Sequence, residues 1–152
     1  MATKNLLSQT KFGLRLSDDE SLLEMTKIQH WLSVESWWAK GREFEVMARA
    51  FENSYPIGIY EGKNQVAVAR IVSDTATFAW LCDVFVESHY RGRGLGTWLA
   101  GASLEWAEHN GVKRIILSTR DAHEVYSRVG FEPLAAPDRW MAIDRRPQAN
   151  EQ

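Results

Sequence analysis

The sequence predicts one mixed α/β domain, in which a central sheet carries helices on both faces. Three strand-like segments follow one another through short turns in the middle of the chain, and helical patterns of apolar residues come before and after them. The chain has 152 residues, 45% of them hydrophobic and 25% charged, which is typical of one globular domain. No internal repeat or linker-like stretch divides it, so we expect a single domain over 1–152 with its core at about 12–144.

The N-terminal third predicts one strand and two helices. FGLRLS at 12–17 alternates apolar and polar residues at strand period. Ser17 and Glu20 then stand at capping-box spacing, which favours a helix start. Two apolar sets at helical spacing follow, separated by Gly41: Leu22, Met25, Ile28 and Leu32, and then Phe44, Met47, Ala48 and Phe51.

The middle of the chain predicts a three-stranded antiparallel meander. The strands are expected at 55–61, 65–73 and 75–87, and turn-forming residues separate them. The third strand is almost wholly apolar, which is typical of a central strand that is covered on both faces. Asp83 is the one charge inside its apolar run.

The C-terminal half predicts two more helices and three more strands. A short buried strand at 114–118 and a short helix stopped by Gly130 follow the first of these helices. FEPL at 131–134 and RWMAID at 139–144 are expected to form a final hairpin before a polar tail at 145–152. The apolar face of the first, long helix is marked by Leu95, Trp98, Leu99, Ala102 and Trp106.

Composition excludes several classes of protein. A net charge of −2 argues against a general nucleic-acid binder, because such proteins usually carry a broad basic face. No apolar run approaches the ~20 residues of a membrane span. Cys82 is the one cysteine, which fits a reducing compartment, so we expect a cytoplasmic protein without membrane contact. No metal site is expected, because Cys82 and the carboxylates share no metal-like spacing with His30, His89, His109 and His123.

The segment RGRGLGT at 91–97 lies between the apolar strand and the long helix. Glycine costs conformational entropy, so three glycines within six residues need a local reason. Backbone N–H groups and the positive end of the helix dipole converge at a helix start, which favours phosphate binding. A P-loop would need Gly-Lys-Ser/Thr, and a dinucleotide fingerprint would need glycine at 97 or 99, where Thr97 and Leu99 stand. A tight turn with surface arginines is the alternative interpretation.

Residues 91–96 resemble the acyl-CoA signature of the GNAT superfamily of N-acetyltransferases, Arg/Gln-x-x-Gly-x-Gly/Ala. The second signature of that family, a helix with a tyrosine that ends in Gly-Phe, is matched by YSRVGF at 126–131. The resemblance implies a sheet of about seven strands, antiparallel at its start and parallel near the cofactor cleft. It also implies acetyl-CoA as cosubstrate, an amine as acceptor, and diphosphate binding by Arg91, Gly92, Arg93, Gly94, Leu95, Gly96 and Thr97.

The resemblance implies two further contributions to catalysis. Backbone N–H groups at a splay or bulge in the apolar strand, near Val84, Phe85 and Val86, would stabilise the developing oxyanion. Tyr126 matches the family tyrosine that hydrogen-bonds the CoA sulfur and acts as general acid. Tyr126 also lies on the apolar stripe of its helix, so a core aromatic is the alternative.

Asp83 has two interpretations. A lone carboxylate in an apolar strand is costly to bury unpaired. It is therefore either a general base at an open cleft, directly or through water, or a structural partner of an arginine such as Arg70 or Arg120. The reserve candidates for the base are Glu52, Glu61 and Asp121.

The acceptor is the least specified part of the prediction. Trp31, Trp37 and Trp38 fall in a region that borders the acceptor pocket in GNAT proteins, where they would form an aromatic wall or simply pack in the core. We expect a small-molecule amine. A non-catalytic acyl-CoA sensor and a protein lysine or N-terminal acetyltransferase are the alternatives, and the sequence leaves open whether the chain forms a homodimer.

Overall fold

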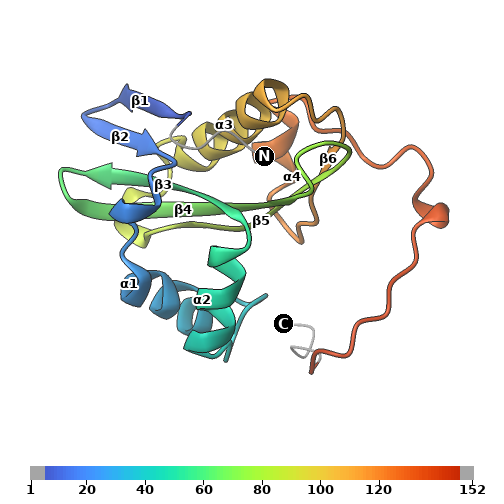
Figure 1. Ribbon diagram of the computed structural model, residues 1–152, viewed down its shortest axis with the longest axis horizontal. Coiled ribbons are helices and arrows are strands. Elements are labelled where there is room, and N and C mark those ends of the chain that lie inside the picture. The colour runs from blue at the N-terminus through green and yellow to red at the C-terminus, as the bar shows by residue number, and fades with distance from the viewer. Residues whose placement is uncertain (1–5, 148–152) are drawn as a thin grey trace.

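The computed structural model describes residues 6–147 of the chain. Within these residues six strands form one mixed sheet, in the order β1-β2-β3-β4-β5-β6 (Figure 1). Neighbouring strands pair antiparallel except β5 and β6, which are parallel. The strands are β1 (Ser8–Lys11), β2 (Leu14–Ser17), β3 (Tyr55–Glu61), β4 (Asn64–Ser73), β5 (Ala79–Val86) and β6 (Ile115–Ile116).

Helices cover both faces of the sheet, as the sequence predicts (Figure 1). On one face lie α1 (Met25–His30) and α2 (Phe44–Glu52), and on the other lie α3 (Leu95–His109) and α4 (His123–Ser127). Among the described residues no helix is long and apolar enough to cross a membrane. The shorter helical turns are η1 (Glu20–Leu22), η2 (Trp31–Glu35), which continues α1, η3 (Ser88–Tyr90) and η4 (Pro137–Arg139).

Each face of the sheet has its own apolar core. Beneath α3, all five side chains that the sequence predicts for the apolar face of this helix are buried. On the opposite face, side chains of α1, η2 and α2 pack with Phe85 of β5. Burying one large apolar side chain contributes roughly 1.5–3 kcal/mol. The two cores therefore hold the sheet firmly between its helices.

β5 contains a bulge near its middle. The pairing with β4 joins Cys82 to Arg70 and then Phe85 to Val68, which leaves two residues of β5 opposite one residue of β4. The first of the two, Asp83, has a φ of 49°, in the left-handed region that residues other than glycine rarely occupy. The resemblance to GNAT proteins predicts a bulge or splay near Val84, Phe85 and Val86. The observed bulge, at Asp83 and Val84, overlaps the start of that stretch.

The bulge changes the face toward which β5 directs its side chains. Leu81, before the bulge, packs in the core beneath α3, whereas Phe85, after it, packs in the core with α1 and α2. On the other edge of β5, β6 pairs only with Ala79 and Trp80. The two strands therefore part beyond Trp80.

The N-terminal strand that the sequence predicts at 12–17 is the second half of a hairpin. β1 precedes it, and the chain turns at Phe12 and Gly13, whose φ values are 55° and 73°. The four residues of β1 are polar or charged, so no apolar periodicity marks it. The helix expected to start at the Ser17–Glu20 spacing and to run on to Leu32 is found in pieces. It begins with the short turn η1, where Asp19 accepts a hydrogen bond from the backbone N–H of Ser21, and it resumes as α1 and η2 from Met25.

The final hairpin predicted at 131–134 and 139–144 is wrong, because these residues form no strand. Residues 132–147, which we call the C-terminal arm, leave the sheet as an extended segment and then turn back, so that Arg146 lines the pocket described below (Figure 1). A short apolar run between polar residues favours an extended backbone, but a strand also needs a neighbouring strand to satisfy its backbone groups. The described sheet accordingly has six strands instead of about seven.

Candidate active site

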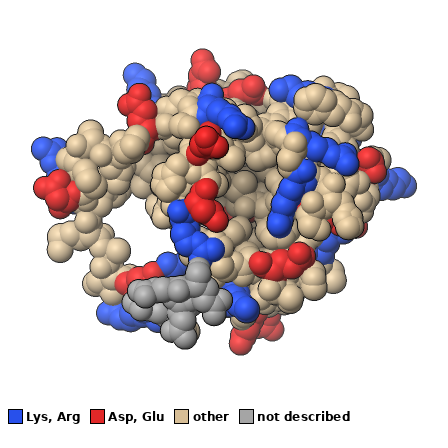
Figure 2. All heavy atoms as spheres, turned by 180° about the vertical axis from the view of Figure 1, so that it is seen from behind, with Lys and Arg blue, Asp and Glu red and all other residues tan. Residues whose placement is uncertain are grey.

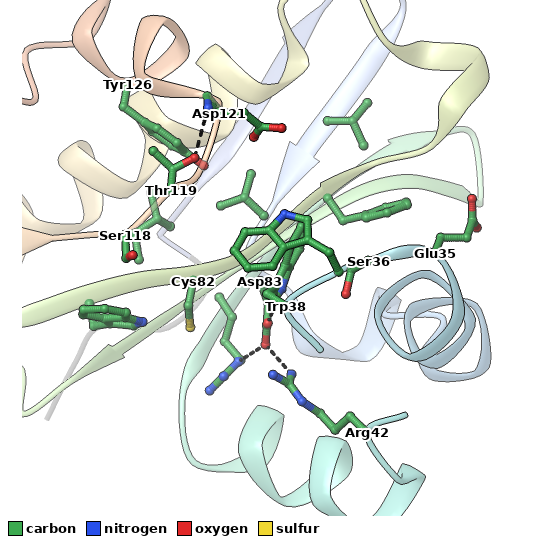
Figure 3. Close-up of a pocket in the computed structure, with 18 of the residues that line it drawn as sticks. Glu35, Ser36, Trp38, Arg42, Cys82, Asp83, Ser118, Thr119, Asp121 and Tyr126 are labelled. Carbon is green, nitrogen blue, oxygen red and sulfur yellow. Dashed lines mark hydrogen bonds and ion pairs between the residues drawn. The ribbon is translucent and has the colours of Figure 1, made fainter. Parts of the chain in front are cut away.

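A pocket of about 670 Å³ lies where β5 and β6 part (Figure 3). Most of its wall comes from β5, from the end of η2 with the loop that follows it, and from the segment 118–126 that leads into α4. Arg70 and Val72 of β4, Arg91 and Arg146 complete the lining. A volume of this size is within the ~300–1,000 Å³ that is usual for small-molecule sites. The pocket is therefore the candidate active site.

The start of α3 depends on glycine for its backbone conformation. Gly92 and Gly94 have φ values of 78° and 79°, and Gly94 is the N-cap of the helix. A Cβ atom on either residue would meet no heavy atom within 4 Å, so these glycines are not required by packing inside the protein. The first N–H groups of α3 have no acceptor inside the helix, so they need a partner from outside it.

The two arginines of the glycine segment have different surroundings. Arg91 lines the pocket, and its Nε donates a hydrogen bond to the carbonyl of Val86 at 2.9 Å. Its guanidinium also lies 5.3 Å from the ring centroid of Phe85. Arg93 is exposed and lies over the ring of Tyr90, 5.1 Å from its centroid. Both arginines are exposed, but Arg91 contacts the end of β5 and borders the pocket, whereas Arg93 rests on Tyr90.

Tyr126 lies on α4 and lines the pocket (Figure 3). α4 packs close to α3, since a Cβ atom on Gly96 would lie 3.4 Å from Cγ1 of Val125. The ring of Tyr126 packs edge-on against Phe131, whose N–H donates to the Tyr126 carbonyl. Burial, and to a smaller extent the charge of Asp121, raises the pKa of Tyr126 to about 12. The phenol therefore keeps its proton at neutral pH.

Asp83 is only 4% exposed and accepts three hydrogen bonds (Figure 3). Oδ1 accepts from Nε1 of Trp38 at 3.0 Å. Oδ2 accepts from Nη1 of Arg42 at 2.8 Å and from Nε of Arg70 at 2.9 Å. We call these four residues the Asp83 cluster. Trp38 and Arg42 belong to the loop before α2 and Arg70 belongs to β4, so the cluster fastens this loop to the sheet at the bulge.

The two arginines determine the charge of Asp83. Burial is the largest single influence and by itself would raise the pKa of Asp83. The hydrogen bonds and positive charges of Arg42 and Arg70 together outweigh it, and the pKa of Asp83 lies below its ordinary value. Of the partners that the sequence suggests, Arg70 is the one found, while Arg120 lies over the ring of Trp37. Arg42 is a partner that no sequence pattern indicates.

The three neighbouring tryptophans separate into two environments. Trp31 is buried and stacks on Phe85, with ring centroids 5.5 Å apart. Trp37 and Trp38 line the pocket and meet edge to face at 5.8 Å. Sequence reasoning did not single out Trp80, a fourth pocket-lining aromatic, which lies where β5 and β6 part.

The other groups that could take part in proton transfer are carboxylates and the single cysteine. Asp121 lines the pocket, as does Glu35, which sequence reasoning missed. Glu61 instead accepts a hydrogen bond from the hydroxyl of Tyr90 outside the pocket lining. Burial raises the pKa of the Cys82 thiol to about 11, so it stays protonated at neutral pH. Among residues 6–147, no group of three or more His, Cys, Asp or Glu side chains is placed to hold a metal ion.

Comparison with known protein families identifies the class of enzyme. The model of the acetyltransferase (GNAT) family matches residues 22–131, which is most of the chain. The chain is therefore an acyltransferase. It belongs to the acetyltransferase (GNAT) family, and the resemblance seen in its two sequence motifs is confirmed.

Individual relatives agree with this assignment. A crystal structure of a GNAT-family protein from Xanthomonas campestris pv. campestris is 39% identical, with a TM-score of 0.81 over 86% of this chain and 92% of that chain. A Gibberella zeae protein designated as a candidate acetyltransferase is 24% identical over 141 residues, which is 78% of each sequence. A Clostridium acetobutylicum acetyltransferase structure described as solved with acetyl-CoA shares the fold, with a TM-score of 0.65 over 86% of this chain and 94% of that one, at 16% identity.

Proposed function

We propose that the protein transfers an acetyl group from acetyl-CoA to a primary amine, most simply the amine of a small molecule, by direct attack in a ternary complex. The observation that carries this proposal is that one pocket is lined both by the bulged strand β5 and by Tyr126, close to the start of α3. A phosphate site, an oxyanion site and a proton donor then lie along one path.

The cofactor side of the proposal rests on the main chain. The N–H groups at 94–97 would donate to the diphosphate of acetyl-CoA, where the helix dipole also favours negative charge. The open space over Gly92 and Gly94 fits a ligand that approaches the backbone closely. Arg91, which borders both this segment and the pocket, is the cation placed to accompany the phosphates. The pantetheine arm would then run along β5 beyond Trp80, where β6 has left its edge.

The chemical step needs a hydrogen-bond donor for the developing oxyanion and another for the departing sulfur. The amine nitrogen attacks the thioester carbonyl carbon, the carbon–sulfur bond breaks, and the nitrogen loses a proton. Backbone N–H groups around 84–86, after the bulge, are assigned to the oxyanion. Tyr126 donates a hydrogen bond to the sulfur, since its pKa of about 12 exceeds the ~8.5 of a thiol and the phenol is protonated.

The contacts of Asp83 favour a structural role over that of general base. A carboxylate that accepts three hydrogen bonds and has a lowered pKa is a poor proton acceptor. We therefore propose that Asp83 positions Trp38 and the bulge, and that proton removal belongs to another carboxylate of the pocket. Asp121 and Glu35 are the candidates, since both line it. Asp83 as general base stays the competing prediction.

The acceptor side of the pocket is aromatic and charged. Trp37, Trp38 and Trp80 line it together with Glu35 and Asp121, which suits a cationic amine held against aromatic rings. A pocket of about 670 Å³ favours a small molecule over a protein, which would need an open groove. The cytoplasmic location expected from the single cysteine stays a prediction.

The proposal is tested by measuring thiol release from acetyl-CoA in the presence of amino acids, polyamines, aminoglycosides, aromatic amines and peptides. Release that depends on one class of small amine, with acetylated product seen by mass spectrometry, is the expected result. Release only with peptides supports the protein acetyltransferase. Binding of acetyl-CoA without release in any mixture supports the non-catalytic sensor and contradicts the enzyme.

A further inference from the structure

The Asp83 cluster contains more positive than negative charge. Asp83 is its one carboxylate, and both Arg42 and Arg70 pair with the same oxygen atom of it, Oδ2. Trp38 is neutral and donates to the other oxygen atom, Oδ1. In the described part of the chain no other carboxylate pairs with either arginine. The cluster therefore carries one net positive charge, because two arginines face one carboxylate.

This positive charge lies inside the pocket. The side chain of Arg42 is 21% exposed and that of Arg70 is 12% exposed, and both line the pocket. A charge that is largely removed from water is costly unless it is paired. The charge does not belong to a basic surface, because basic and acidic side chains are interspersed over the face in Figure 2 and the net charge of the chain is −2. The excess charge is therefore a local property of the pocket, where an anionic ligand would compensate it.

The two guanidinium groups still have N–H groups to donate. Arg42 uses Nη1 and Arg70 uses Nε to bind Asp83, and Nη1 of Arg70 lies 3.5 Å from Oγ of Ser54. Within the described residues, Nη2 of each arginine makes no hydrogen bond. The backbone of Arg42 is also held, since its carbonyl accepts a hydrogen bond from Nε2 of Gln29 at 2.9 Å. Two fixed guanidinium groups with spare donors are suited to binding a carboxylate.

The other side of the pocket carries the groups assigned to the chemical step. Asp121 and Tyr126 belong to the segment that leads into α4, whereas Arg42 lies beyond Asp83, at the loop before α2 (Figure 3). Asp121 pairs with neither arginine of the cluster. The residues proposed for the oxyanion, 84–86, follow Asp83 directly in β5. An acceptor that reacts here therefore has one end near Asp121 and the thioester and the other end near the two arginines.

We propose that the acceptor is an amine that also carries a carboxylate, and that Arg42 and Arg70 bind this carboxylate while the amine faces the thioester. This inference rests on the proposed function, because it names the class of acceptor for the same site. A carboxylate has one negative charge, which matches the single excess charge of the cluster, whereas a phosphate monoester has about 1.5–2. The products are the N-acetylated amino acid and coenzyme A, whose thiol takes up the proton that the amine loses.

The first test compares each acceptor with its own amide. Glycine, β-alanine, γ-aminobutyrate, L-phenylalanine and L-tryptophan are supplied as free acids and as carboxamides, and thiol release from acetyl-CoA gives kcat/KM for both forms. For the preferred acceptor we expect the acid to exceed the amide about 10- to 100-fold, which is the range for hydrogen bonds to a charged group. Amides that react as well as their acids overturn the inference and leave the acetyltransferase intact.

Variants assign the preference to the cluster. Arg42→Gln leaves Asp83 and Arg70 as a neutral pair, so the fold should survive, and urea unfolding checks this. The ratio of acid to amide is expected to fall to near one, and any general loss of activity cancels in this ratio. Arg49→Gln is the matched control, since it removes the same charge from an exposed position on α2 outside the pocket lining. An unchanged ratio in R42Q contradicts the inference.

A binding measurement separates this inference from the proposed function. Propionate, 3-phenylpropionate and indole-3-propionate have a carboxylate but no amine to acetylate, and calorimetry measures their binding to protein saturated with coenzyme A. At least one of them is expected to bind wild type about 10-fold or more tightly than R42Q. Such binding without turnover of any amine supports the carboxylate site and contradicts the acetyltransferase. Absence of binding by all three, or equal affinity in wild type and R42Q, overturns the carboxylate site.

Discussion

The proposed phosphate site and the Asp83 cluster are built in different ways. At the start of α3 the proposed phosphate site is made by main-chain N–H groups, and its residues are adjacent in the sequence. At the Asp83 cluster the site is made by side chains that come from a loop, from β4 and from β5. The first site is sensitive to backbone conformation and the second to side-chain charge, so they are probed by different substitutions.

The largest effect on stability is expected at the Asp83 cluster. Asp83→Asn leaves Arg42 and Arg70 without a counter-charge in a buried place, which costs about 3–5 kcal/mol in the free energy of unfolding. Urea unfolding measures it. Asp144→Asn is the matched control, because it breaks the exposed ion pair with Arg146 and should leave the midpoint unchanged. Equal midpoints for D83N and wild type would show that the cluster does not hold the loop.

The difference in unfolding free energy between wild type and D83N should depend on pH. The pKa of Asp83 is lowered on folding, so its contribution is fully present above the unfolded pKa of about 3.9 and is lost as pH falls through the folded value. The gap in unfolding free energy between wild type and D83N should therefore be constant at neutral pH and shrink below about pH 4. A gap that grows toward low pH would reveal a raised pKa and return Asp83 to the role of base.

The kinetics of D83N test the same point independently. If Asp83 positions the loop, D83N lowers kcat/KM but keeps the acidic limb of the pH–rate profile, because another group still loses its proton. Asp121→Asn and Glu35→Gln are the companion variants, and one of them is expected to remove that limb. Loss of the limb in D83N alone would identify Asp83 as the base.

A smaller effect, on turnover rather than binding, is expected at Tyr126. Tyr126→Phe removes the proton donor but keeps the edge-on packing with Phe131, so we expect kcat to fall about 10- to 100-fold while the Kd of acetyl-CoA changes little. Tyr55→Phe is the matched control, since Tyr55 packs on Trp106 away from the pocket lining. Unchanged turnover in Y126F would make Tyr126 a core aromatic.

The smallest effect is expected at the tryptophan of the cluster. Trp38→Phe removes the hydrogen bond from Nε1 to Asp83, which contributes about 1 kcal/mol to stability. Trp37→Phe, for which no such bond to Asp83 is described, should change stability less, although both variants should raise the KM of an aromatic or cationic acceptor if the two rings form its wall. An unchanged KM in both would remove the wall.

The sequence predicts the features that are encoded by residues close together in the chain, and it misses contacts between distant residues. The apolar face of α3 is encoded by residues close together in the sequence, and it was predicted. The sequence also marks 91–96 as a segment where glycine needs a local reason, but not the positive φ of Gly92 and Gly94. Arg42 was not, because it is 41 residues from Asp83 in the chain and only the fold joins them. The bulge was expected through the family resemblance, but nothing in the apolar run of β5 marks Asp83 as the residue with positive φ.

The C-terminal arm shows why a strand is hard to predict from sequence alone. Residues 139–144 are an apolar run between charged residues, and a strand was predicted, but pairing depends on whether an edge lies within reach in the same chain. β1 fails in the opposite way, since its polar residues carry no periodic signal although they pair in register with β2. Both errors arise because strand formation is decided by the neighbour and not by the segment alone.

The central claim is that backbone N–H groups at the start of α3 bind the diphosphate of acetyl-CoA, and titration calorimetry tests it most directly. Wild-type protein should bind coenzyme A at least about 100-fold more tightly than pantetheine, which lacks the diphosphate. Gly94→Val, which forces a β-branched residue to a φ of 79°, should weaken coenzyme A binding about 100-fold, whereas Gly111→Val, at a φ of 72° beyond the other end of α3, should leave it unchanged. Equal affinity for coenzyme A in G94V and wild type would contradict the account.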